Sequence, residues 1–136
     1  MDTFNASQEF CQLVAATADL CFKPFKYAVV NDSSIDKISI QCDDPIELII
    51  RLECRSIEGE RCFENDLDLE IYCSGGDLNL LIGWSNQLDL PILWQGHHSV
   101  WMDASNGKRA QSPTDGQSLE SFARRLRALL FQQENQ

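Results

Sequence analysis

Residues 46–84 read IELIIRLECRSIEGERCFENDLDLEIYCSGGDLNLLIGW, and the alternation of apolar and polar side chains in this stretch decides the fold. Apolar residues occupy the even positions of 46–54, the odd positions of 67–73 and the even positions of 78–84. Because successive residues of a strand point to opposite faces of a sheet, each segment predicts a strand with one apolar face. Together the three segments predict an antiparallel meander.

Two glycine-containing turns, at Glu58-Gly59 and Gly75-Gly76, predict the register of these strands. The three apolar sets share one sheet face only if the residue numbers of antiparallel partners add up to an odd number. A two-residue turn at each site meets this condition, and glycine suits such turns. The predicted pairs are Ile50 with Leu67, Leu48 with Leu69, Leu69 with Ile82 and Ile71 with Leu80.

Helical periodicity flanks the predicted sheet on both sides. Apolar spacings of three and four residues predict one helix over 6–20 and another over 116–131, with 131–136 as a frayed tail. We therefore expect a single α+β domain over 1–136: an antiparallel β-meander of six or seven strands, curled or partly closed, with an N-terminal and a C-terminal helix. Further extended segments are expected at 27–31, 37–42, 90–94 and 99–103, with a hairpin turn at Asn106-Gly107.

The composition limits the partners that we expect. The chain has 136 residues and a net charge of −10, with 17 acidic and 6 basic residues in 1–96 but 4 acidic and 5 basic residues in 97–136. An acidic domain repels phosphate backbones, so nucleic-acid binding is disfavoured. No signal-peptide pattern or apolar run of about 20 residues is found, which predicts a cytoplasmic protein without membrane association. Six cysteines without a C-x-x-C pair predict free thiols and no zinc site.

Three carboxylates, Asp66, Asp68 and Glu70, alternate with leucines and are expected about 7 Å apart on the outward face of one strand. The predicted register places Arg51 opposite Asp66 and Glu47 opposite Glu70. Such a row could offer oxygen ligands to Mg²⁺ or Ca²⁺, but its side chains diverge along the strand and the turn glycine of a calcium loop is missing. We therefore expect no metal and no cofactor.

The stretch from Trp84 to Trp101 contains all three tryptophans and both histidines. Trp84 has the parity of the core, whereas Trp94, His97, His98 and Trp101 are candidates for a ligand or partner surface. Tryptophan is enriched at interfaces and in ligand pockets, because it combines a large apolar ring with one polar group. The leading hypothesis is a non-enzymatic interaction or accessory module that binds a protein partner or a small ligand near this stretch.

A small enzyme is the alternative hypothesis. It would use His97 or His98 together with Asp103 or a cysteine, since an imidazole can activate a thiol or be oriented by a carboxylate. The sequence contains no phosphate loop, nucleophile elbow or zinc-protease motif, so we assign no catalytic residue. A homo-oligomer is compatible with the sequence.

Cys62 is a candidate reactive thiol. The predicted turn puts Cys54 opposite Phe63 on the apolar face, and Cys62 opposite Arg55 on the other face. Cys62 then departs from the apolar pattern, and a basic neighbour favours its thiolate. In this register Cys54 and Cys62 cannot form a disulfide, although a turn one residue longer would set them directly opposite each other.

Overall fold

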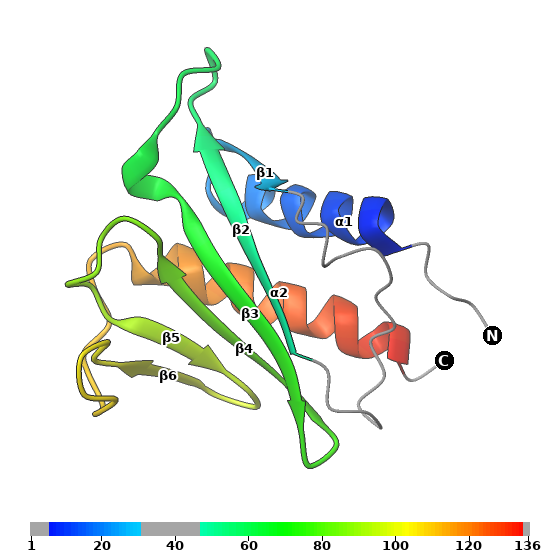
Figure 1. The fold of residues 1–136 in the computed structure, drawn as a ribbon, viewed down its shortest axis with the longest axis vertical. Coiled ribbons are helices and arrows are strands. Elements are labelled where there is room, and N and C mark those ends of the chain that lie inside the picture. Colours follow the sequence, from blue (N-terminus) through cyan, green and yellow to red (C-terminus); the bar gives the residue numbers. More distant parts are fainter. Residues whose placement is uncertain (1–5, 31–46, 135–136) are drawn as a thin grey trace.

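The computed structural model describes residues 6–30 and 47–134, which form six antiparallel strands and two α-helices. The strands follow chain order in one open sheet, and every neighbouring pair is antiparallel (Figure 1). This α+β meander confirms the predicted fold class. The elements are α1 (Ala6–Cys21), β1 (Lys26–Val30), β2 (Glu47–Arg55), a 3₁₀ helix η2 (Phe63–Asn65), β3 (Leu67–Ser74), β4 (Asp77–Trp84), β5 (Ile92–Gln95), β6 (Ser99–Met102) and α2 (Gly116–Glu134).

Both helices cover the same face of the sheet (Figure 1). α1 packs on β1 and α2 packs on β4 and β5, while the two helices also contact each other. The apolar side chains of the two helices pack against the apolar face of the sheet. The hydrophobic core lies between the helices and the sheet. The largest fully buried side chains are Phe10, Phe122, Leu52, Leu67, Leu69, Ile71, Leu78, Leu80, Ile82, Leu93 and Leu119.

Most predicted elements appear within a few residues of their expected bounds. α2 continues to Glu134, three residues beyond the predicted end of the last helix. Within the described residues β1 and β6 are the two edges of one open sheet. The strand predicted at 37–42 lies outside the described residues. Neither helix, as described, is long and apolar enough to span a membrane.

The register between β3 and β4 is the predicted one, but the register between β2 and β3 is not. Leu69 pairs with Ile82 as expected. On its other side Leu69 pairs with Ile50, whereas the sequence predicted Leu48. The prediction was wrong by two residues along β3, which leaves every side chain on its expected face because the side-chain period of a strand is two.

The β2–β3 hairpin explains this shift. Arg55 bridges to Arg61, and the Cys62 N–H donates to the Cys54 carbonyl at 2.9 Å, so the turn is one residue longer than predicted. The 3₁₀ turn η2 then takes up three residues that pair with nothing on β2, and the ladder resumes at Leu67. The tip of this hairpin projects beyond the rest of the sheet (Figure 1).

Candidate functional site

The face of the sheet that the helices leave uncovered carries a pocket of about 760 Å³, which we call the open-face pocket. Strand alternation assigns residues 49, 51, 68, 70, 81 and 83 to this face, because their neighbours in sequence are buried under the helices. Apolar side chains dominate the lining. They come from five strands and one loop: Val30, Ile49, Leu81, Leu88, Ile92 and Met102.

Gly83 leaves space on the floor of the pocket because it has no side chain. It pairs with Asp68 on β3 and faces Ile92 on β5. A Cβ atom added at Gly83 would meet the Cγ1 atom of Ile92 at 3.5 Å, which is an ordinary van der Waals distance. Glycine is therefore not required by backbone geometry or by a steric clash at this position, and its effect is to leave space.

The loop after β4 forms one wall of the pocket and is fastened to η2. The Asn86 side-chain amide donates to the Phe63 carbonyl at 2.8 Å, and the Gln87 amide donates to the Glu64 carbonyl at 2.7 Å. These bonds hold Leu88 over the pocket, although its side chain is 80% exposed.

The turn after β6 forms the opposite wall. Asp103 accepts hydrogen bonds from the N–H and the hydroxyl of Ser105, at 2.8 and 2.6 Å. These bonds hold the pKa of the Asp103 carboxyl below its usual range, so the carboxylate is charged at neutral pH. Gly107, with φ of 73°, reverses the chain so that Arg109 bridges back to Met102, as expected of an Asn-Gly turn.

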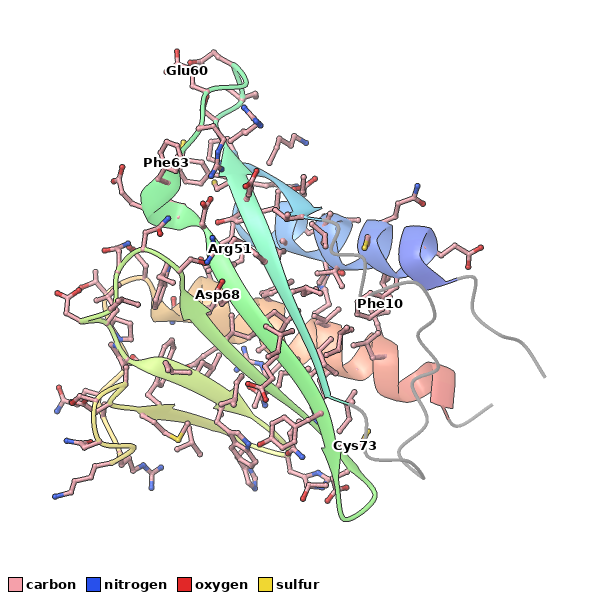
Figure 2. The ribbon with its side chains drawn as sticks, in the orientation of Figure 1. Phe10, Arg51, Glu60, Phe63, Asp68 and Cys73 are labelled. Carbon is pink, nitrogen blue, oxygen red and sulfur yellow. The ribbon has the colours of Figure 1, made fainter. Side chains whose placement is uncertain are left out.

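Charged groups line the pocket with an excess of negative charge. Arg51 and Asp68 point toward each other (Figure 2), with 3.2 Å between Nε and Oδ1. The same Asp68 oxygen accepts a hydrogen bond from the Ser85 hydroxyl at 2.7 Å. Glu70 and Asp103 also line the pocket, so the charged side chains among its described lining residues are three carboxylates and one arginine. An arriving cation would therefore be attracted.

The predicted row of carboxylates is interrupted at Asp66, which is 2% exposed and does not lie on the open face. Its carboxylate accepts hydrogen bonds from the Cys54 N–H at 2.7 Å and from both Nη atoms of Arg61, at 3.0 and 2.7 Å. Burial alone raises the pKa of this carboxyl, but these hydrogen bonds and the charge of Arg61 hold the pKa below its usual range. Arg51 faces Asp68 instead of Asp66, because of the register shift.

The tryptophans predicted to form one surface lie on opposite faces of the sheet. Trp101 is buried under the helices, stacks on Trp84 at 6.2 Å between ring centroids, and donates its N–H to Glu120 of α2 at 2.6 Å. Trp94 lies on the open face and donates its N–H to the Tyr72 hydroxyl at 2.9 Å. Trp84 and Trp101 are thus core residues, as parity indicated for Trp84.

Both histidines are exposed on the turn between β5 and β6. His97 contacts Asp77, with 3.4 Å between Nε2 and Oδ1. Asp103, the carboxylate predicted to work with them, lies at the other end of β6, about 17 Å from His98 along an extended strand. Neither histidine lines the open-face pocket. Trp94, His97, His98 and Trp101 therefore do not form one site.

The four cysteines at 11, 21, 54 and 62 are free thiols, whereas Cys73 is disulfide-bonded. The expectation of free thiols is thus wrong for Cys73. Cys62 is half-buried and packs against the core, so the face predicted for it is wrong as well. Phe63, predicted to be apolar-facing, is 60% exposed and lies under the Arg61 guanidinium at 4.4 Å.

Sequence reasoning missed the open-face pocket, but a signal for it was present. Val30, Ile49 and Leu81 are apolar residues at positions where alternation demands an outward side chain. Gly83 adds a gap near the end of β4, between Ile82 and Trp84, and a glycine in a strand often marks a close approach of a ligand or another backbone. Apolar residues and a glycine at outward strand positions therefore indicated that the outer face of the sheet carries apolar surface.

Comparison with known proteins identifies a family without identifying an activity. A family model described as a domain of unknown function, DUF8659, matches residues 11–129, which is most of the chain. The match begins within α1, covers the six described strands and ends within α2. No match was found among curated proteins or among solved structures.

Proposed function

We propose that this chain, which belongs to the DUF8659 family, is a binding module that holds an apolar, positively charged segment of a protein partner in the open-face pocket. The proposal depends on one observation, the convergence of exposed apolar side chains on a single hollow. Val30, Ile49 and Leu88 are 40%, 61% and 80% exposed, and all three line the pocket. Exposed apolar surface with a polar rim is typical of interaction sites.

The extent of the pocket favours a peptide segment over a small ligand. Its lining runs from Val30 on β1 to Met102 on β6, and strands in a sheet lie about 4.8 Å apart, so the lining spans about 24 Å. A helix with its side chains is about 10–12 Å across and an extended chain advances about 3.3 Å per residue. Several side chains of one segment can therefore contact the lining at once.

The charges of the pocket favour a basic segment. Arg51 is already paired with Asp68, and Glu70 and Asp103 add two further carboxylates on the lining. A lysine or arginine beside the apolar side chains of the partner would meet complementary charge, and the acidic chain as a whole would speed its approach.

The alternative hypothesis, a small enzyme, receives less support at this site. The described lining residues include no histidine, cysteine, serine, threonine or lysine. Those groups supply most nucleophiles and many general bases, and the acid–base groups that the described lining does contain are the carboxylates of Asp68, Glu70 and Asp103. His97 and Asp77 are in contact, but on an exposed turn outside the pocket. The cytosolic location and the homo-oligomer stay predictions.

A synthetic amphipathic peptide of leucine and lysine is the probe that tests the proposal, with its binding to the full chain measured by calorimetry. Gly83→Leu should weaken binding at least tenfold, about 1.4 kcal/mol, because the new side chain fills the hollow without changing any charge. Gly83→Ala is the matched control for the fold, since its Cβ meets Ile92 at an ordinary distance, and it should weaken binding less.

A second pair of variants keeps the test decisive if Gly83→Leu disturbs the sheet. Leu88→Ser removes an exposed apolar side chain of the pocket, and Ile57→Ser removes one that is 69% exposed on the β2–β3 hairpin outside it. We expect weaker binding for Leu88→Ser alone. Equal losses for Leu88→Ser and Ile57→Ser, unchanged binding in Gly83→Leu, or equal binding of a leucine–glutamate peptide would each refute the proposal.

A further inference from the structure

Two free cysteines face each other at the base of the β2–β3 hairpin. Arg55 and Arg61 form an antiparallel bridge, and the Cys62 N–H donates to the Cys54 carbonyl at 2.9 Å, so the next pair inward is Cys54 with Cys62. Opposite residues of an antiparallel pair project to the same face, with Cα atoms about 4.5–5.5 Å apart. Disulfides span Cα separations of about 4.4–6.8 Å, so this pairing suits a disulfide.

The two thiols are close neighbours on the core face. Cys54 belongs to the hydrophobic core, and Cys62 is partly buried and packs against that core. Each sulfur has in addition a long contact to a carbonyl, Cys54 Sγ to the oxygen of Arg55 at 3.9 Å and Cys62 Sγ to that of Glu60 at 3.7 Å. Such thiol hydrogen bonds are weak, so little would oppose a small movement of either sulfur toward the other.

The environments of the two thiols differ, and the difference gives them different roles. Cys54 has no exposed surface, while Cys62 is partly exposed. Burial raises the pKa of the Cys54 thiol to about 11, so Cys54 is protonated at neutral pH. A reagent from solution therefore reaches Cys62 first. Cys54 can react only with the sulfur of Cys62, which lies opposite it in the hairpin.

We propose that Cys54 and Cys62 are a dithiol site that exchanges with a small disulfide of the glutathione class and forms a reversible disulfide across the hairpin. In the first step the Cys62 thiolate attacks one sulfur of glutathione disulfide, whose S–S bond breaks, and one glutathione leaves as a thiolate. In the second step Cys54 attacks the Cys62 sulfur, the second glutathione leaves as a thiolate, and the proton of Cys54 passes to that thiolate. The two cysteines lose two electrons, which reduce one glutathione disulfide to two glutathiones.

The test equilibrates the full chain with glutathione redox buffers, blocks free thiols with iodoacetamide and maps the peptides by mass spectrometry. Trypsin cuts after Arg55 and Arg61, and chymotrypsin cuts after Tyr72, so Cys54, Cys62 and Cys73 fall on separate peptides. We expect a linked pair of peptides containing Cys54 and Cys62, which dithiothreitol separates.

Cys62→Ser is the main variant, because this side chain is only half-buried, and it should abolish the link while leaving Cys54 reduced. Cys21→Ser is the matched control: it removes another partly exposed thiol and should leave the link intact. Cys54→Ser should stop the reaction at a stable glutathione adduct on Cys62. The proposal is overturned if the wild-type chain accumulates that adduct, if both thiols stay open to alkylation under oxidising buffers, or if either cysteine is found linked elsewhere.

Discussion

Asp66→Asn is the substitution for which the structure makes the sharpest energetic prediction. Asp66 accepts one hydrogen bond from the Cys54 N–H and two from Arg61, all at 3.0 Å or less. An asparagine oxygen at the Oδ1 position can still accept from the Cys54 N–H and from Nη1 of Arg61, but its amide N–H₂ then faces Nη2 of Arg61, so the 2.7 Å bond and the attraction between opposite charges are both lost. Hydrogen bonds to charged groups are each worth about 1.5–3 kcal/mol, and Arg61 stays 19% exposed to water, which offsets part of the loss. We expect a net loss of about 3 kcal/mol.

Asp68→Asn is the matched control for this loss, because it removes the same charge two residues along the chain. Asp68 pairs with Arg51 at 3.2 Å, but the two side chains are 50% and 52% exposed. Exposed ion pairs contribute about 0–1 kcal/mol, since water screens them and holding both side chains costs entropy. The two variants therefore differ in burial while the change in charge is the same.

The pH dependence of unfolding provides a second measurement of the same interaction. The pKa of Asp66 is lower in the folded chain than its unfolded value of about 3.9. A depressed pKa means that the carboxylate stabilises the fold at pH values above about 4, and that this contribution is lost as the pH falls through the folded pKa. The difference between wild type and Asp66→Asn should be constant from about pH 5 to 8 and shrink below about pH 4.

Urea unfolding followed by tryptophan fluorescence measures these free energies, since Trp84 and Trp101 are buried in the core. The midpoint shift multiplied by the m-value gives the loss for each variant. A loss below about 1 kcal/mol for Asp66→Asn, or an equal loss for Asp68→Asn, would refute the role assigned to the buried Arg61–Asp66 pair.

Three further predictions follow from the same structure. Leu69→Ala should cost about 2–5 kcal/mol in urea unfolding, because Leu69 is fully buried between Ile50 and Ile82, and a loss below about 1 kcal/mol would contradict that position. Brief iodoacetamide treatment of the reduced native chain should label Cys62 before Cys54, as mass mapping will show. Calorimetry should find no micromolar Mg²⁺ or Ca²⁺ site that Asp68→Asn removes, because Asp66 faces away from the row.

The hairpin between β2 and β3 shows where sequence reasoning reaches its limit. Parity correctly assigned Leu48, Ile50, Leu67 and Leu69 to the core face, because burial of one face forbids a one-residue slip. Parity cannot separate registers that differ by two residues, since both bury the same side chains. In the observed register the 3₁₀ turn η2 precedes Asp66, whose buried carboxylate accepts hydrogen bonds from Arg61 and Cys54.

The residues of the candidate site were likewise predicted only in part. The Trp84–Trp101 stretch contributes Trp84, Leu88, Leu90 and Ile92 to the open-face pocket, but Trp94, Trp101 and the two histidines are not among its described lining residues. Trp101 lies in the core, where its ring stacks on Trp84 and its indole N–H donates a hydrogen bond to Glu120 of α2. Those partners lie far away in sequence, so no local pattern could assign the face of Trp101.

By itself the sequence determined the class of fold, the order of its elements and the face of nearly every strand residue, because periods of 2.0 and 3.6 are local properties of the backbone. Only the tertiary structure decided that both helices cover the same face of the sheet. That choice leaves Ile49, Leu81 and Leu88 uncovered and turns Gly83 from a weak strand residue into the floor of a pocket. The tertiary structure also sets Cys54 opposite Cys62, next to the buried Asp66 and its partner Arg61, and alternation encodes neither arrangement. Interactions between residues distant in the chain determine these features, and a pattern of single-residue polarity carries no information about them.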